Sequence, residues 1–405
     1  MILESFTTRK YVADDKLWEM IKRANNLTQG GFSSWDDNAP VLVPLLKRIL
    51  ARAREVRDWQ IYFYVMGKAL WYIGRDDVQD TRFAFQISEM FHQAYREGLA
   101  AETTRFGREY FVDTAARILD LYMQYPQIDD VKMGQMLSIF LECEEKYGTA
   151  WNAGNYVCVL SVGLLDRDGE LIEKSKKKLA SLDFDSWCYI CYYVRPMLKY
   201  YVYREDFDRI EELILSVSRK EIPKKYQWCY QQCEQANEET LVFEALAHCM
   251  DYGKPELFRK IFDRWPERCR NPIEGDIVTC DALLHAMAGD LSRLEEVIQV
   301  AEEDDRKYQE NKVTPFDAMY WFLYWHLYFR LLDRHGIGFV RMNPVGEIEN
   351  RTARVEADGR REYSCQALSE YFGRKSDEIG RQMSRSRSKF DYGTMKKSHE
   401  ICLRL

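Results

Sequence analysis

Two pairs of cysteines are the residues whose type and spacing first suggest chemistry. Cys188 and Cys191 stand three residues apart, and Cys229 and Cys233 follow about forty residues later, four apart. Zinc takes four such thiolates in tetrahedral reach, usually from loops or knuckles. Both pairs lie inside apolar helical stretches without turn residues, where cysteine acts as a small buried hydrophobe. We therefore predict no metal site and no cofactor.

Catalytic templates are missing from the chain. It has no GxxxxGK[ST], GxSxG or HExxH motif, and no GxGxxG between a strand and a helix. Acidic pairs such as Asp129/Asp130 and Glu144/Glu145 are interpreted as solvated helix ends. We predict a non-enzymatic protein. An (α/α)-toroid carbohydrate-active enzyme stays an open alternative, because its catalytic carboxylates and stacked tryptophans come from distant helices.

Two aromatic segments, residues 187–203 and 318–332, offer surfaces for a ligand. Aromatic side chains at helical spacing can stack on a partner and hydrogen-bond to it. The alternative is burial, because residues 318–332 are apolar on all sides and a nearby carboxylate can satisfy Arg330. At about fifteen residues, this run is too short to span a bilayer, which needs ~20. The predicted partner-binding residues are Tyr192, Tyr193, Arg195, Trp321, Tyr324, Trp325 and Tyr328.

The last sixty-five residues suggest a second kind of partner. They hold 14 basic and 10 acidic residues, whereas residues 1–340 hold 44 and 55, so a mildly basic tail follows an acidic body. Gly373 precedes Ile379 by six residues, the spacing of a DNA-binding helix-turn-helix. The candidate phosphate contacts are Arg381, Arg385, Arg387 and Lys389. The alternative is a terminal helix pair with a solvated basic face.

Residues 239–266 set the pattern to which the other segments are compared. Apolar residues recur every three or four positions before Gly253 and again between Pro255 and Pro266. Glycine can stop a helix in the left-handed conformation, and proline suits the first turn of the next one. Similar helix-break-helix units have breaks at Asp168, Glu205 and Gly289, and together with Gly253 the four breaks stand 37, 48 and 36 residues apart. A helical-repeat architecture of about eight helix pairs is expected.

The chain resembles the tetratricopeptide-repeat superfamily in a degenerate form. The resemblance rests on the Tyr252-Gly253 break, the Phe258/Phe262 pair and the closing Pro266, with weaker echoes at residues 203–213 and 288–301. No unit carries the full signature. The resemblance implies an all-α fold, a right-handed α-α superhelix, over residues 40–335. It also implies that a protein or peptide is held in the concave face of the array.

These patterns give three segments. Residues 1–39 are predicted to form one helix and a polar loop, residues 40–335 the repeat domain, and residues 336–405 a small β-hairpin near 351–363 followed by basic helices. Eleven scattered cysteines and the lack of an apolar leader predict reduced thiols and a cytoplasmic location, away from membranes. The expected function is a binding module for a protein or peptide. The alternatives are a nucleic-acid-linked regulator and the toroid enzyme.

Overall fold

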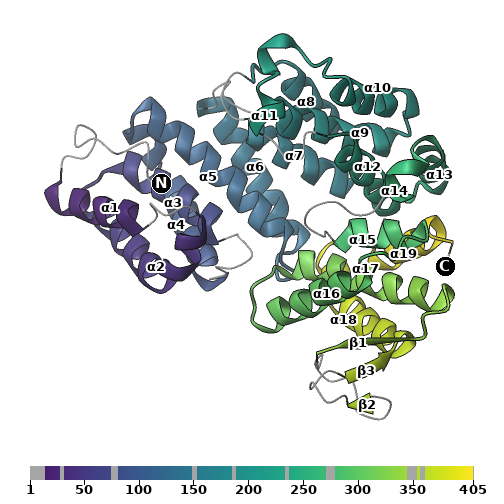
Figure 1. Cartoon of the computed structure of the whole chain (residues 1–405). Helices are drawn as coiled ribbons and strands as arrows, with labels where there is room; N and C mark the ends of the chain where they lie inside the picture. The colour runs from purple at the N-terminus through teal and green to yellow at the C-terminus, as the bar shows by residue number, and fades with distance from the viewer. Residues whose placement is uncertain are drawn as a thin grey trace. The chain divides into compact units, whose positions relative to one another are not determined.

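The chain folds into helices with one small sheet (Figure 1). The computed structural model describes residues 14–27, 32–73, 81–147, 153–184, 188–232, 237–270, 279–343, 354–355 and 361–404. Contacts between residues divide the chain into two compact units. Unit 1 comprises Met1–Cys158 with Asn311–Thr314, and unit 2 comprises Val159–Glu310 with Pro315–Leu405. The predicted domain boundaries after residues 39 and 335 stay predictions.

Unit 1 is helical throughout its described residues. Its elements are α1 (Asp15–Leu27), α2 (Phe32–Glu55), α3 (Trp59–Ile73), α4 (Thr81–Arg96), the short η3 (Leu99–Glu102), α5 (Arg105–Met123), α6 (Asp130–Tyr147) and the first part of α7 (Ala153–Asp166). Helix α2 packs against α1 and α3, and α5 packs against α3 and α6.

Unit 2 contains the remaining helices. They are α8 (Gly169–Ala180), η4 (Ile190–Val194), α9 (Arg195–Arg204), α10 (Phe207–Ser218), η5 (Lys224–Tyr226), α11 (Cys229–Gln232), α12 (Glu238–Tyr252), α13 (Pro255–Arg264), α14 (Pro266–Arg270), α15 (Thr279–Met287), α16 (Leu294–Gln309), α17 (Pro315–Arg334), α18 (Cys365–Ser386) and α19 (Tyr392–Cys402). Helix α12 packs against α9, α10, α13 and α19, and α17 packs along α18 and α15.

The sheet of unit 2 has three antiparallel strands in the order β1-β3-β2. Strand β3 (Arg361–Ser364) pairs with β2 (Arg354–Val355), which confirms the predicted hairpin pairing, and also with β1 (Phe339–Met342), which was not predicted. Val340 and Tyr363, opposite each other in the β1–β3 ladder, are buried. The expected turn at residues 358–359 lies outside the described residues.

The predicted helix breaks take the conformation that stops a helix. Gly253 and Gly289 have positive φ angles of 70° and 86°, and Glu205 adopts the same left-handed conformation at 58°. At the fourth break Arg167 is left-handed, with φ of 52°, and Asp168 caps α8 by accepting a hydrogen bond from the backbone N of Leu171. The left-handed residues at these breaks therefore end one helix, and a capping side chain such as Asp168 begins the next.

Pro40 and Pro44 lie inside a helix, where a loop and then a helix start were expected, whereas Pro266 lies at a helix end. The polar loop expected before Pro40 is wrong, because α2 begins at Phe32 and contains Pro40 and Pro44. Each ring removes one backbone hydrogen bond, and the fully buried Leu42, Leu45 and neighbouring apolar residues offset that loss. At Pro266 the predicted helix end is confirmed. Helix α13 ends at Arg264, and Pro266 opens the short α14.

The predicted all-helical class with a small sheet is confirmed. The superhelical path and the number of helix pairs stay predictions. Among the described helices, none combines the length and the apolar character that a membrane crossing requires.

Candidate functional site

A cavity of about 330 Å³ lies within unit 2, lined by residues from α7, α9, α12, α17, α19 and the junctions before α8 and α19. Its aromatic wall comes from α17, where Phe316, Tyr320 and Tyr324 follow one another at four-residue spacing and so share one face. The rings of Phe316 and Tyr320 meet edge to face at 5.1 Å. Burial raises the pKa of the Tyr320 and Tyr324 hydroxyls, so both stay neutral hydrogen-bond donors.

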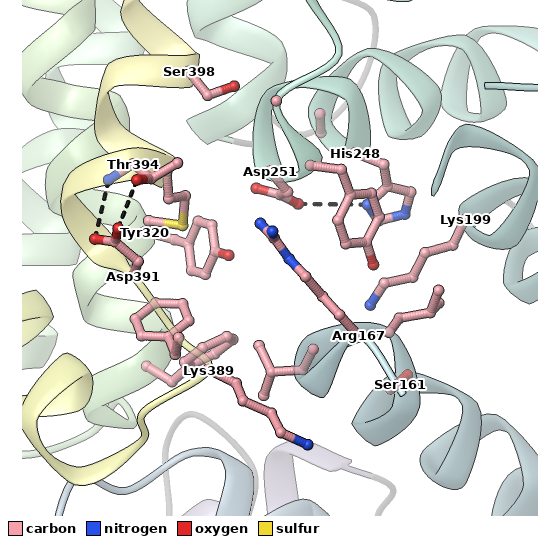
Figure 2. Close-up of a pocket in the computed structure, with 18 of the residues that line it drawn as sticks. Ser161, Arg167, Lys199, His248, Asp251, Tyr320, Lys389, Asp391, Thr394 and Ser398 are labelled. Carbon is pink, nitrogen blue, oxygen red and sulfur yellow. Dashed lines mark hydrogen bonds and ion pairs between the residues drawn. The ribbon is translucent and has the colours of Figure 1, made fainter. Parts of the chain in front are cut away.

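Two cations face this wall (Figure 2). Lys199 comes from α9, and Arg167 comes from the left-handed junction between α7 and α8. The structure records no hydrogen bond or ion pair from either side chain to any residue that it describes. Burial lowers the pKa of Lys199, although the charges of Asp251 and Glu244 oppose that shift. The cavity therefore holds positive charge without a bonded carboxylate.

Asp251 lies between two imidazoles. Its Oδ2 is 3.5 Å from Nδ1 of His248, and its Oδ1 is 3.6 Å from Nε2 of the fully buried His399. Nδ1 of His399 lies 2.9 Å from the carbonyl oxygen of Met395, which can only accept, so Nδ1 carries the proton. Burial lowers the pKa of His399 and favours the neutral ring. Its Nε2 then has no proton to give to Asp251.

The two atoms that face each other here are both unsatisfied. Asp251 Oδ1 and His399 Nε2 are buried, and neither has a hydrogen-bond partner among the described residues. Buried polar atoms are usually paired, so each exception needs an explanation. We call Arg167, Lys199, His248, Asp251 and His399 the cavity cluster. Within it the two unsatisfied atoms are buried, whereas the side chains of Arg167 and Lys199 line the cavity.

Helix α19 closes one side of the cavity. Asp391 caps this helix by accepting hydrogen bonds from the backbone N and Oγ1 of Thr394, at 3.2 and 2.6 Å. Those hydrogen bonds hold the pKa of Asp391 below its usual value. Ser398 Oγ donates to the carbonyl oxygen of Met250 at 2.7 Å, a contact between residues 148 positions apart. The cavity is thus assembled from distant segments of the chain.

A second polar group in unit 2, the paired cluster, comprises Asp304 and Asp305 with the residues bonded to them. Asp304 Oδ2 accepts from Trp325 Nε1 at 2.9 Å and from Thr279 Oγ1 at 3.0 Å. Asp305 Oδ1 accepts from Tyr371 at 2.9 Å and pairs with Lys375 Nζ at 2.5 Å. Burial raises the pKa of Asp304 to about 6, although the two hydrogen bonds oppose the shift. Both carboxylates are therefore already bonded to other side chains of the protein.

The predicted groove residues are scattered. Tyr324 lines the cavity, but Trp325 and Tyr328 are 0% and 2% exposed and belong to the core of unit 2, so a groove role is wrong for both. Their helix is apolar all round and packs on both α15 and α18. The others, all half-buried and none of them among the described residues that line the cavity, are Tyr192, Tyr193, Arg195 and Trp321.

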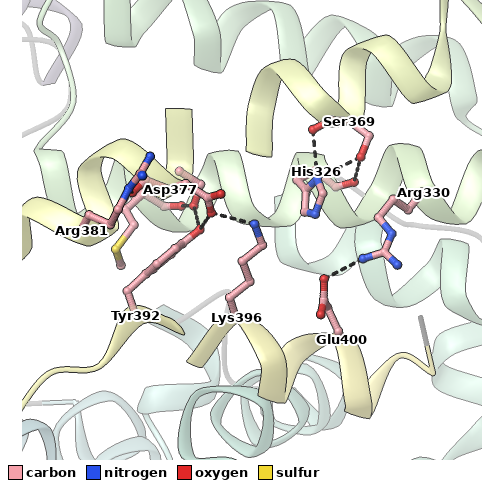
Figure 3. Close-up of polar contacts among 10 residues, drawn as sticks. His326, Arg330, Ser369, Asp377, Arg381, Tyr392, Lys396 and Glu400 are labelled. Carbon is pink, nitrogen blue, oxygen red and sulfur yellow. Dashed lines mark hydrogen bonds and ion pairs between the residues drawn. The ribbon is translucent and has the colours of Figure 1, made fainter. Parts of the chain in front are cut away.

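The polar residues of the aromatic helix are satisfied by α18 and α19 (Figure 3). Arg330 Nη1 pairs with Glu400 Oε1 at 2.7 Å, as the burial alternative predicted. His326 Nδ1 lies 2.9 Å from Ser369 Oγ. Burial lowers the pKa of His326, so its ring is neutral near pH 7. These contacts join α17 to its neighbours.

The helix-turn-helix prediction is wrong at its turn. Helix α18 runs unbroken from Cys365 to Ser386, with Gly373 at a close approach to α17. A Cβ atom at Gly373 would lie 2.9 Å from Nδ1 of His326, so packing explains this glycine. Of the predicted phosphate contacts, Arg387 is buried, whereas the exposed ones are Arg381, Arg385 and Lys389. Lys389 borders the cavity instead, and its side chain extends away from Asp251 (Figure 2).

The cysteine pairs differ from their predicted burial. Cys229 is buried, but Cys188 and Cys191 are half-buried, because they lie where the chain enters the η4–α9 helix. Cys233 lies outside the described residues. Within the described part of the chain, no group of three or more His, Cys, Asp or Glu residues could hold a metal ion.

Sequence reasoning missed the cavity cluster. Lys199 interrupts an apolar aromatic helix and Asp251 stands near the end of another, which are signals for buried charge. Nothing local shows that these two residues line one cavity, or that Asp251 lies 3.6 Å from His399. Comparison with protein-family models, with curated proteins and with solved structures gives no match for this chain.

Proposed function

We propose that this chain is a non-enzymatic binding protein, a degenerate helical-repeat array that holds an acidic peptide segment of a partner protein. In this proposal the cavity of unit 2 receives one acidic side chain of the segment together with a neighbouring aromatic side chain. The observation that carries it is the pair Arg167 and Lys199, which face the cavity without a bonded carboxylate among the described residues.

The charge of the cavity supports an anionic ligand. A desolvated ammonium is unfavourable unless it is paired, and burial lowers the pKa of Lys199 accordingly. A ligand carboxylate would supply the missing partner, and the guanidinium of Arg167 suits bidentate recognition of such a group.

The wall of the cavity supports an aromatic neighbour. Phe316, Tyr320 and Tyr324 present a continuous ring surface opposite the cations. Offset or edge-to-face contacts of a ligand ring with such a surface contribute about 0.5–1.5 kcal/mol each. A volume of about 330 Å³ lies at the small end of ligand pockets, which accommodate one or two side chains rather than a whole domain.

The test uses three fluorescein-labelled peptides of matched length, with repeats of Glu-Phe-Ser, Gln-Phe-Ser and Lys-Phe-Ser. Fluorescence anisotropy with the full chain is expected to rank them in that order, because only glutamate supplies a carboxylate that can bond to Arg167 and Lys199. Lys199→Met should weaken binding of the glutamate peptide at least tenfold. The matched control is Lys177→Met, which removes an exposed lysine of α8 outside the cavity and should leave the affinity unchanged.

Two outcomes would overturn the proposal. One is equal affinity for the glutamate and glutamine peptides. The other is a glutamate-peptide affinity that Lys199→Met and Lys177→Met reduce alike, since binding would then follow net charge rather than the cavity.

A further inference from the structure

A cluster of three thiols lies at the start of the η4–α9 helix, outside the lining of the cavity. Cys188 and Cys191 are three residues apart in one helical turn, and the carbonyl oxygen of Cys188 accepts the backbone N–H of Tyr192 at 2.9 Å. Side chains three apart on a helix share a face. Cys229 Sγ accepts the backbone N–H of Tyr189 at 3.3 Å, so the third sulfur comes from α11.

Stacked rings hold these two segments together. Tyr189, next to Cys188, stacks on Tyr226 with ring centroids 4.6 Å apart and planes 9° apart, and on Tyr193 at 4.9 Å. Tyr226 precedes Cys229 by three residues and is buried. The stack fixes the backbone on both sides of the sulfurs, so the thiols are positioned before any reaction.

The Cys188 thiol differs from the other described cysteines. Hydrogen bonds from Cys191, and more weakly from Cys229, lower the pKa of Cys188 to about 5 although burial opposes the shift. Burial instead raises the pKa of Cys143, Cys365 and Cys402 to about 12. Thiolates, not thiols, are nucleophiles, so reactivity should concentrate at one position. Arg195, ion-paired with Glu244, lies beside Cys191 and can stabilise a second thiolate.

We propose that Cys188 and Cys191 form a redox-active dithiol that is converted to an intrahelical disulfide by low-molecular-weight disulfides such as oxidised glutathione. The proposal rests on the shared helical turn, the hydrogen-bonded sulfurs and the half-exposure of both residues. Cys229 is the accessory thiol, because it is buried and its sulfur is engaged by Tyr189.

The reaction has two exchange steps. The Cys188 thiolate attacks one sulfur of the reagent, so that a mixed disulfide forms while the reagent's S–S bond breaks and the departing thiolate takes a proton from solvent. Cys191 then loses its proton to solvent and attacks Cys188 Sγ, which releases the second thiol. Two protein thiols are oxidised to one disulfide, and the reagent is reduced to two thiols.

Peptide mapping by mass spectrometry of the full chain, treated with oxidised glutathione, tests the proposal. The unmodified protein should yield a Cys188–Cys191 disulfide. Cys191→Ser should instead accumulate a glutathione adduct on Cys188, because the resolving thiol is missing. In a parallel measurement that needs no variant, iodoacetamide at pH 6 should alkylate Cys188 at least ten times faster than Cys280, a half-buried cysteine of α15 that serves as the internal control.

Three results would overturn the proposal. The first is a disulfide from Cys188 to Cys229 in place of Cys191. The second is alkylation of Cys188 no faster than that of Cys280. The third is one zinc ion per chain in the purified protein, released by a thiol-blocking reagent, since a metal would then account for the clustered sulfurs. None of these results bears on peptide binding at the cavity, so the two proposals fail separately.

Discussion

Unit 2 contains two groups of polar side chains that differ in how they are satisfied. In the paired cluster, Asp304 accepts two hydrogen bonds from side chains, and Asp305 accepts hydrogen bonds from Tyr371 and Gln309 and pairs with Lys375. In the cavity cluster, Asp251 and His399 present unsatisfied atoms to each other, and Lys199 has no bonded partner among the described residues. The first group joins helices to one another. The second places Arg167 and Lys199 at a cavity without a bonded carboxylate among the described residues.

The difference separates charges that are bonded to neighbouring side chains from charges that have no bonded partner among the described residues. A buried ion pair is strongly destabilising to break, because the remaining partner is left uncompensated. A buried charge that was never paired already lowers stability, so its removal should stabilise the fold. The two clusters should therefore respond to substitution with opposite signs. The predictions that follow run from the largest expected effect to the smallest.

Asp305→Ala should lower the free energy of unfolding by about 3–5 kcal/mol. It leaves the Lys375 ammonium and the Tyr371 hydroxyl without the carboxylate that both contact. Urea denaturation followed by circular dichroism measures the change. A loss below 1 kcal/mol would mean that the paired cluster is no more structural than the cavity cluster.

Trp325→Phe should lower stability by about 1–3 kcal/mol, because it keeps most of the ring but removes a hydrogen bond to Asp304. The loss should grow with pH. The raised pKa of Asp304, about 6, means that its carboxyl is mainly protonated in the folded state at pH 5 and ionised at pH 8. The lost donor stabilised the ionised form, so the deficit should be larger at pH 8. Thermal melts at both pH values test this, and equal deficits would contradict it.

Lys199→Met should raise the free energy of unfolding by about 1 kcal/mol. Burial lowers the pKa of Lys199, which means that the folded protein holds the ammonium less favourably than the unfolded chain does. An apolar side chain of similar length removes that penalty. Lys177→Met, at an exposed position, should leave the melting temperature unchanged. Destabilisation by Lys199→Met alone would show that this lysine is structural.

Arg167→Gly should raise stability by about 0.5–1 kcal/mol, since glycine adopts positive φ without strain. Arg167 has φ of 52° and an exposed side chain. The same substitution removes a cavity cation, so binding of the glutamate peptide should weaken as stability rises. Asn311→Gly, at another left-handed position with φ of 56°, is the control that should change stability alone.

Sequence patterns predicted the ends and the buried faces of individual helices better than the packing of those helices against one another. Breaks at Glu205, Gly253 and Gly289 could be predicted because residue type and local conformation decide where a helix ends. The buried Leu368, Phe372, Ile379 and Met383 of α18 follow from helical periodicity in the same way. For the aromatic helix α17 the sequence left two alternatives, a ligand-binding face or burial. Trp325 is fully buried, so this part of the helix belongs to the core.

The site could not be predicted because its contacts are not local. Asp251 and His399 meet through the packing of α19 on α12, which no spacing in the sequence reports. At Gly373 the error was the opposite one, because a local pattern was interpreted as a turn although a long-range contact explains it. A glycine in a helix suggested a turn, yet it marks a close approach of α17 through His326. Short-range patterns do not distinguish these two uses of glycine.

The hydrogen bond from Ser398 to Met250 has a consequence for protein synthesis. The two residues are 148 positions apart, so α12 leaves the ribosome well before α19 exists. At synthesis rates of about 5–20 residues per second, this delay lasts on the order of ten seconds. During it the nascent chain carries the buried charges of α9 and α12 without the helix that encloses them. The cavity would therefore be among the last features that the protein acquires, and under the proposed function an unfinished chain would not bind the peptide.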